Sequence, residues 1–250
     1  MHPVLFKIGP FTVYTYGFFV FLGILAGWLF SLKEAIHYNL PKDTISDLIF
    51  WTIVWGFIFS RLGYIVTHWD YFLEDWWRSI ISSGGFVFYS GLLGGLLFLL
   101  FFVRKKSLSL LKTLDLLSPS LALAHSLGRI GCFFYGCCYG KPTSSFLGIK
   151  FPPDSPAGQL GQPLIPTQLI SSFFLLIIFI ILLILRDKKL PPGRVFVSYL
   201  LLYGAFRFVI EFYRGECLGY FLSLSIGQWL SLGLILASFF IWLRIKRIKA

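Results

Sequence analysis

The chain has 250 residues, of which 57% are hydrophobic and 13% charged, and its formal net charge is +11. Soluble domains carry about 25% charged residues, so this composition excludes a soluble globular domain and predicts an integral membrane protein. A nucleic-acid partner is not expected either, because the basic residues form short clusters beside apolar runs, where they act as topology signals.

Apolar runs long enough to cross a bilayer recur along the chain. A membrane-spanning helix needs about 20 apolar residues. The first run has no small-residue cleavage pattern after it, so we expect it to be kept as a helix rather than removed as a signal peptide. We predict an all-α fold and a single membrane domain over residues 1–250. Its seven expected transmembrane helices lie near residues 12–32, 45–66, 85–103, 113–128, 167–185, 195–213 and 223–243.

Basic residues accumulate at alternate connections between these helices and at the C-terminal tail. The positive-inside rule therefore predicts a cytoplasmic C-terminus and an N-terminus on the outer face. Fourteen of the 22 Lys and Arg residues lie on the predicted cytoplasmic side: Lys33, Lys42, Arg104, Lys105, Lys106, Lys112, Arg186, Lys188, Lys189, Arg194, Arg244, Lys246, Arg247 and Lys249.

Two segments are expected on the outer face. The segment from His68 to Arg78 is rich in Trp and acidic residues, which is typical of an interfacial helix. Residues 129–166 contain many prolines and glycines and are too few for a soluble domain. They predict a small folded cap or an ordered loop.

The segment 125–142, HSLGRIGCFFYGCCYGKP, combines charge, glycine and thiols among hydrophobic runs. Arg129 follows directly on an apolar run, and an intramembrane charge indicates a functional site. The glycines at positions 128, 131, 136 and 140 predict irregular backbone, which at membrane depth must line a cavity or be buried in protein. The Arg129 guanidinium would offer a planar fork to a phosphate or carboxylate. The alternative is an interfacial arginine that snorkels, but snorkelling needs no glycines.

A second pair of charges lies in the expected sixth helix. Arg207 and Glu211 are four residues apart and share a helix face, so we expect them to pair. The pair is either part of the site or only a structural ion pair that makes both charges tolerable in the bundle. Arg214 lies further out and is interpreted as interfacial.

Two tyrosines and the cysteines complete the candidates. Tyr16 and Tyr89 either contact a lipid headgroup or belong to an aromatic belt. His125 with the cysteines at 132, 137 and 138 does not have the paired spacings of zinc sites, so no metal is expected and the thiols are interpreted as small packing residues. Adjacent Cys137 and Cys138 are poorly placed to bridge each other.

Over nearly its whole length the chain resembles the prolipoprotein diacylglyceryl transferase family. The combination of GRIG.F..G with YGAFR..IEF..R, in this order, is highly specific. The resemblance rests on YG at 16–17, SRLGY at 60–64, GG..F..GL.G at 84–94, GRIG.F..G...G at 128–140, PTQL at 166–169, YGAFRFVIEF.R at 203–214 and GQ.LS at 227–231.

The resemblance implies an enzyme of the bacterial inner membrane that moves diacylglyceryl from phosphatidylglycerol to the lipobox cysteine of prolipoproteins. The family's essential arginines fall on Arg129 and Arg207, and its acid falls on Glu211. Other expected contacts with phosphatidylglycerol are Tyr16, Arg61, Gly128, Gly131 and Gly140. No cofactor is implied, and the partners are phosphatidylglycerol, the lipobox segment and the bilayer.

The sequence departs from the family pattern at several positions. Tyr89 stands where many members have a histidine, Ile165 replaces a second histidine, and Cys132 and Cys137 replace residues of the family's arginine motif. His125 is the nearest replacement for a catalytic histidine. In the expected mechanism the arginines stabilise the leaving phosphate and favour the substrate thiolate, with Tyr16 and Tyr89 as auxiliaries.

Two other classes of membrane protein are the alternatives. A transporter of an anionic solute would often show internal repeats, and none is apparent in the sequence. A membrane thiol oxidoreductase would favour a C-x-x-C spacing, which the three motif cysteines do not have.

Overall fold

The structure is a computed structural model that describes residues 3–9, 11–81, 86–188, 190–215 and 219–249. The chain forms two compact units. The large unit comprises residues 1–31 and 114–250, and the small unit comprises residues 32–113. Helices α1 and α6 each run from one unit into the other.

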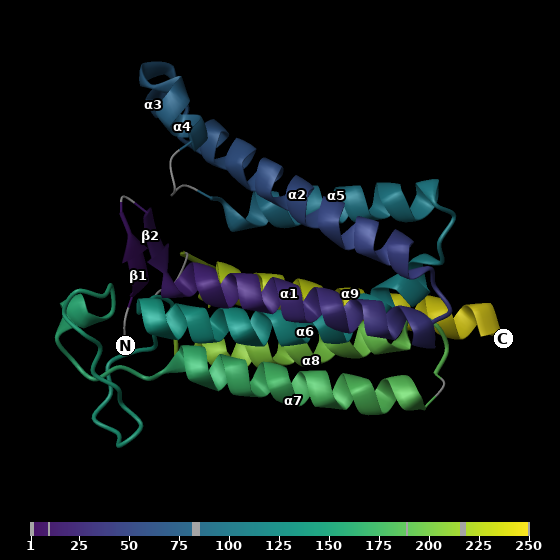
Figure 1. The fold of residues 1–250 in the computed structure, drawn as a ribbon. Coiled ribbons are helices and arrows are strands. Elements are labelled where there is room, and N and C mark those ends of the chain that lie inside the picture. Colours follow the sequence, from purple (N-terminus) through teal and green to yellow (C-terminus); the bar gives the residue numbers. More distant parts are fainter. Residues whose placement is uncertain (1–2, 10, 82–85, 189, 216–218, 250) are drawn as a thin grey trace. The chain divides into compact units, whose positions relative to one another are not determined.

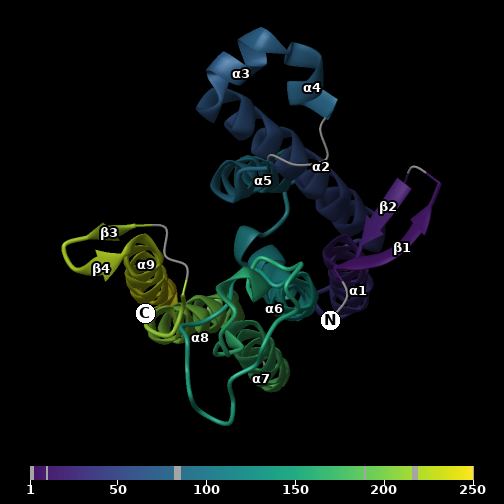
Figure 2. The same ribbon diagram turned by 90° about the vertical axis from the view of Figure 1, so that its left-hand side faces the viewer.

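The large unit is built on helices that run side by side (Figures 1 and 2). A hairpin of β1 and β2 leads directly into α1, and a second, shorter hairpin of β3 and β4 leads into α9. A 3-10 turn, η1, lies in the segment between α6 and α7. The bounds are β1 Val4–Ile8, β2 Phe11–Tyr14, α1 Thr15–His37, α6 Leu110–Tyr135, η1 Gly158–Leu160, α7 Thr167–Asp187, α8 Arg194–Glu211, β3 Tyr220–Phe221, β4 Leu224–Ser225 and α9 Ile226–Lys249.

Small residues let α1 and α6 approach closely. A Cβ added at Gly23 would lie 2.7 Å from the carbonyl oxygen of Ala124. Nearby, the Ser31 hydroxyl donates a hydrogen bond of 2.7 Å to the Ser120 hydroxyl. Small residues at helix interfaces are typical of membrane bundles, in which packing and interhelical hydrogen bonds drive association.

A buried carboxylate caps α8. Asp115, from α6, accepts hydrogen bonds from the backbone N–H groups of Gly193 and Phe196 at 2.6 and 2.7 Å. These N–H groups lack partners inside the helix, so the carboxylate satisfies them and complements the positive end of the helix dipole.

The small unit packs α2 (Lys42–Thr67) against α5 (Phe88–Lys105). Glycines again permit the approach, since a Cβ at Gly91 would lie 2.9 Å from the Gly56 carbonyl oxygen. The expected interfacial helix is present as two short helices, α3 (Trp69–Glu74) and α4 (Trp76–Ile81).

Seven described helices have 18 or more residues and match the seven expected ranges. Five of them, α1, α2, α5, α7 and α9, are long and apolar enough to span a membrane. The other two, α6 and α8, carry the charged residues of the motifs. The chain is thus a mostly helical membrane protein.

Three expectations were wrong in detail. The fold is not purely α-helical, because the two hairpins precede α1 and α9. The first helix begins at Thr15 rather than near residue 12, because residues 11–14 pair as a strand. The glycine motif is not irregular throughout, because α6 continues to Tyr135 and the irregular segment begins only at Gly136.

The expected cap is present between α6 and α7. It has its own small core of Phe151, Ala157 and Leu164. In Figure 1 the loops of this segment lie at the end of the large unit opposite the C-terminus. The basic clusters that follow α7 and end α9 lie at the C-terminal end.

Candidate active site

A small cavity lies at the cap end of the large unit, between α6, α7 and α8. It is lined by three arginines, a histidine, a thiol and hydroxyl groups. The residues are His125 and Arg129 from α6, Cys138 from the following loop, Thr167, Ser171 and Leu175 from α7, Tyr203, Phe206, Arg207 and Ile210 from α8, and Arg214 just beyond α8.

Arg129 is held by the turn of α6 that precedes it. Its Nε donates a hydrogen bond of 3.2 Å to Nε2 of His125. The His125 ring also contacts the Tyr203 ring, with centroids 5.4 Å apart. His125 therefore uses its Nε2 lone pair to orient the guanidinium, whose other nitrogens remain available to the cavity.

A single buried carboxylate connects two arginines. Glu211 Oε2 forms an ion pair with Arg207 one turn earlier on α8, and lies 3.9 Å from Arg214 NH1. Its other oxygen, Oε1, accepts a hydrogen bond of 3.0 Å from the Ser225 hydroxyl. The Glu211 side chain is only 3% exposed. The expected pairing of Arg207 with Glu211 is confirmed.

A glycine of α9 leaves room for this pair in its present position. A Cβ at Gly227 would lie 2.6 Å from Glu211 Oε1 and 3.0 Å from Arg207 NH2. Gln228 accepts a hydrogen bond from the Ser225 N–H and so holds the strand that carries the Ser225 hydroxyl. The GQ motif therefore supports Glu211 from a neighbouring element.

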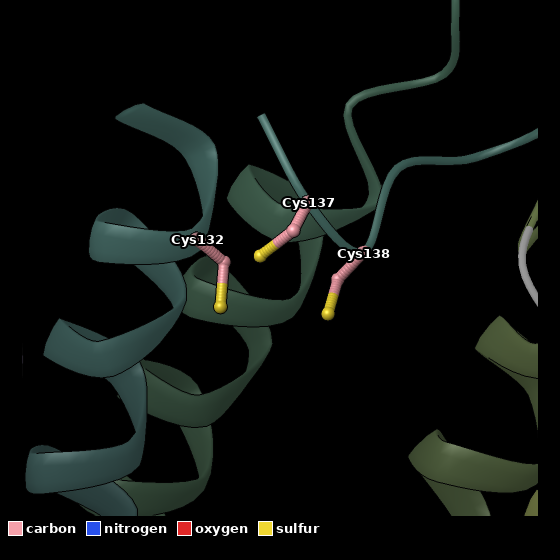
Figure 3. A group of neighbouring side chains, drawn as sticks. All are labelled: Cys132, Cys137 and Cys138. Carbon is pink, nitrogen blue, oxygen red and sulfur yellow. The ribbon is translucent and has the colours of Figure 1, made fainter. Parts of the chain in front are cut away.

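The loop after α6 brings three thiols together (Figure 3). Gly136 adopts a left-handed backbone, with φ of +81°, and its N–H bonds to the Cys132 carbonyl at 2.9 Å. This ends the helix and turns the chain back, as glycine commonly does at helix C-termini. As a result the sulfurs of Cys132, Cys137 and Cys138 all lie within 4.8 Å of one another.

Two side chains at the start of α7 fix this loop. The Thr167 hydroxyl donates to the Cys138 carbonyl, and the Gln168 amide donates to the Cys137 carbonyl, both at 2.8 Å. This explains the position of the PTQ motif. Hydrogen bonds from Cys132 and Cys137, together with the positive charges of Arg129 and Arg214, lower the pKa of the Cys138 thiol.

The other expected residues of the large unit, Tyr16, Gly128, Gly131 and Gly140, are not among those that line the cavity. Gly140 packs against the cap, where a Cβ would lie 2.6 Å from the Ile165 carbonyl oxygen. Gly131 faces α1, with a Cβ 3.2 Å from the Tyr16 carbonyl oxygen. The Tyr16 ring packs beside the Tyr135 ring, with the two ring centroids 6.1 Å apart. Gly128 has open space beside it, so its packing does not require glycine.

Two expected site residues belong to the small unit. The Tyr89 side chain is exposed and its ring contacts Phe88. The Arg61 guanidinium lies over the rings of Tyr64 and Phe86, at 5.3 and 5.4 Å from the centroids. Their roles toward substrate stay predictions. Gly84 and Cys217 lie outside the described residues.

Sequence reasoning missed part of the site. Arg214, interpreted as interfacial, lines the cavity with a side chain that is 15% exposed, because the Gly215 N–H bonds to the Tyr139 carbonyl and draws this turn onto the cysteine loop. Cys138 and Thr167 were not recognised as lining residues. The final arginine of YGAFRFVIEF.R was the available signal for Arg214.

Known proteins match the chain over nearly its whole length. The family model described as "Prolipoprotein diacylglyceryl transferase" matches residues 3–244. A phosphatidylglycerol–prolipoprotein diacylglyceryl transferase of Clostridium tetani is 36% identical and covers 97% of each chain. One from Clostridium perfringens is 34% identical, over 100% of this chain and 97% of the relative. One from Halalkalibacterium halodurans is 34% identical, over 96% of this chain and 84% of the relative. These matches agree with the motifs that form the cavity, and the chain belongs to the prolipoprotein diacylglyceryl transferase family.

Proposed function

We propose that the protein transfers the diacylglyceryl group of phosphatidylglycerol to the lipobox cysteine of bacterial prolipoproteins. The substrate sulfur supplies the electron pair for a new S–C bond to the terminal glycerol carbon. The bond between that carbon and the phosphate oxygen breaks, and glycerol phosphate leaves with the electron pair. The enzyme forms no covalent intermediate.

The observation that carries the proposal is the excess of positive charge in the cavity. Three arginines (Arg129, Arg207 and Arg214) line the cavity, and one carboxylate, Glu211, lies beside two of them, Arg207 and Arg214. This leaves a surplus of two positive charges among these four side chains. A phosphate that gains negative charge as it leaves is stabilised by preorganised donors in a cavity that holds little water. Guanidinium groups suit this task because their planar fork matches phosphate oxygens.

The arginines have different supports and therefore different proposed roles. Glu211 and Ser225 hold Arg207, whereas His125 holds Arg129. We assign Arg129, Arg207 and Arg214 to the phosphate and Glu211 to positioning. His125 is also a positioning residue, because the Nε2 lone pair that a base would use already accepts from Arg129.

The proposed location is the bacterial inner membrane, with the cavity and cap toward the outer face. The support is the charge distribution. The end of α7, which carries Arg186 and is followed by Lys188, and the start of α8 at Arg194 lie at the end of the large unit opposite the cap, together with the basic tail. The positive-inside rule assigns that end to the cytoplasm. Prolipoproteins emerging from translocation then meet the cavity from the outer leaflet.

The direct test uses purified protein in detergent–phospholipid micelles with a lipobox peptide. Phosphatidylglycerol should yield a peptide heavier by one diacylglyceryl group, and glycerol phosphate in equal amount. A peptide with serine in place of the lipobox cysteine should stay unmodified. Absence of the thioether product from a correctly folded protein would refute the proposal.

A further inference from the structure

The three thiols form a cluster that the transfer reaction described above does not use. Their sulfurs lie within 4.8 Å of one another. A zinc ion with Zn–S bonds of about 2.3 Å in tetrahedral geometry holds its sulfurs about 3.8 Å apart. Each pair therefore needs to close by no more than about 1 Å, which side-chain rotation of Cys137 and Cys138 can supply.

The backbone of the cluster is fixed independently of the thiols. The N–H groups of Gly136 and Cys137 both bond to the Cys132 carbonyl, and the carbonyls of Cys137 and Cys138 are held from α7. Cys138 is also held in a left-handed backbone, with φ of +59°, which is costly for a residue with a Cβ. The three ligands are thus preorganised. The irregular spacing C-x4-C-C becomes suitable through the helix-ending turn at Gly136.

We propose that Cys132, Cys137 and Cys138 bind one zinc ion through three thiolates, and that the fourth coordination position opens toward the arginine-lined cavity. Three protein ligands with an open fourth position are the arrangement of zinc sites that act on a substrate, whereas structural sites are closed by a fourth side chain. Cys138 itself lines the cavity, so the cluster and the arginines share one space.

The charge of the surroundings fits this site. Zn²⁺ with three thiolates carries a net charge of −1, and burying it needs compensating positive charge. Arg129 and Arg214 line the same cavity as Cys138. Without a cation between them, three thiolates this close together would repel one another.

The fourth position would bind the thiol of the substrate, a role that rests on the proposed transferase function. The substrate sulfur replaces a water molecule on zinc, its proton passes to solvent, and the sulfur keeps its electron pair for attack on the glycerol carbon. A thiol that coordinates zinc is deprotonated. The metal is not oxidised or reduced, so the step needs no further reactant.

Cobalt substitution tests the site without relying on activity. The protein, purified in detergent with a phosphine reductant, is stripped of metal and titrated with Co²⁺. We expect one Co²⁺ per chain, with the intense sulfur-to-cobalt charge-transfer absorption of a tetrahedral thiolate site, and its displacement by Zn²⁺. Cys132→Ser and Cys138→Ser should lose this absorption, whereas Cys217→Ser, which removes a thiol from outside the cluster motif, should keep it.

A measurement on the unmutated chain guards against variants that misfold. Equimolar Zn²⁺ should protect the half-buried thiols of Cys137 and Cys138 from alkylation, as read by peptide mass spectrometry, and a chelator should restore their reactivity. No charge-transfer band together with unprotected thiols would overturn the proposal, as would a disulfide among these cysteines that binds no metal once reduced.

The lipobox peptide tests the open position. Its thiol should change the cobalt spectrum, and the serine peptide should not. If the thiol peptide left the spectrum of bound cobalt unchanged, the proposed open fourth position would be wrong. If the spectrum responds but no diacylglyceryl is transferred, the metal site stands and the proposed function fails.

Discussion

At the scale of single residues, the cavity depends on how each arginine is held. Arg129 receives its orientation from His125 on the preceding turn, and Arg207 from Glu211 on the following turn. The two supports come from different helices, α6 and α8, so the guanidinium groups are set independently. The roles of the arginines can therefore be separated by mutation.

Replacing Arg129 or Arg207 by lysine should lower the transfer rate by about 10²-fold, because a lysine keeps the charge but loses the fork that matches phosphate oxygens. The rate is measured with saturating phosphatidylglycerol and normalised to inserted protein. Lys150→Arg, at an exposed position of the cap, is the matched control, because it also exchanges lysine and arginine. It should leave the transfer rate unchanged. Near wild-type rates for both lysine variants would make these arginines structural.

Glu211→Gln should have a milder effect, with kcat lower by about tenfold, or about 1.4 kcal/mol. The amide keeps one acceptor oxygen for its partners but no longer pairs with Arg207 as a charge. Because the cavity gains one net positive charge, KM for phosphatidylglycerol should not rise.

The matched control for Glu211→Gln is Asp154→Asn, which also removes one negative charge, but from an exposed side chain of the cap. It should change neither kcat nor KM. A loss of activity carried entirely by a higher KM in Glu211→Gln would show that the carboxylate serves lipid binding instead of positioning.

Much of the site's composition could be predicted from the sequence, but its geometry could not. Arg129, Arg207 and Glu211 were identifiable because charges are rare within apolar runs. Arg214 was not, because its position depends on a hydrogen bond between Gly215 and Tyr139, which are far apart in the chain. The thiol cluster was missed for the same reason, since no spacing rule includes the turn that reverses the chain at Gly136.

At the scale of elements, the helix-ending turn at Gly136 determines what the site contains. It combines a left-handed backbone with a close approach to the cap: a Cβ there would lie 2.7 Å from Ser155 Cβ, and the Gly136 carbonyl accepts from the Ala157 N–H. Glycine is therefore needed for both reasons.

Gly136→Ala should destabilise the protein by about 2–5 kcal/mol, the sum of the left-handed backbone cost and overpacking. Gly161→Ala is the matched control, because Gly161 has φ of +65° but no atom within 4 Å of an added Cβ, so it should cost only about 1 kcal/mol. Thermal unfolding in detergent compares the two. Equal losses of stability would contradict the close contact with Ser155.

The extents of the helices show why the elements were easier to predict than their ends. Seven apolar runs gave seven long helices, because a bilayer-length run has few other solutions. The end of α6 was misjudged because Gly128 and Gly131 were interpreted as helix breakers. In a bundle a glycine also permits close approach, and Gly131 lies against Tyr16 of α1.

At the scale of the whole molecule, the distribution of basic residues predicts the orientation of the chain in the membrane. A cysteine introduced at Asp154 should react with an impermeant thiol reagent in intact cells, and one at Lys188 only after permeabilisation. The unmodified chain, with its native cysteines, provides the background. Labelling of both positions from the same side would refute the proposed topology.

The division into two units has a consequence for synthesis. In the sequence the small unit is inserted between two parts of the large one, so residues 15–31 of α1 emerge from the ribosome before residues 32–113, and residues 114–135 of its packing partner α6 only after them. Because synthesis proceeds at about 5–20 residues per second, α1 spends several seconds in the bilayer before α6 covers the face that carries Gly23 and Gly27. During that interval α2 and α5 can already pair, so the insert completes its fold first. The cavity is completed only after α8, which brings Arg207 and Glu211 on adjacent turns, and after Arg214 and Ser225 that follow it in the chain.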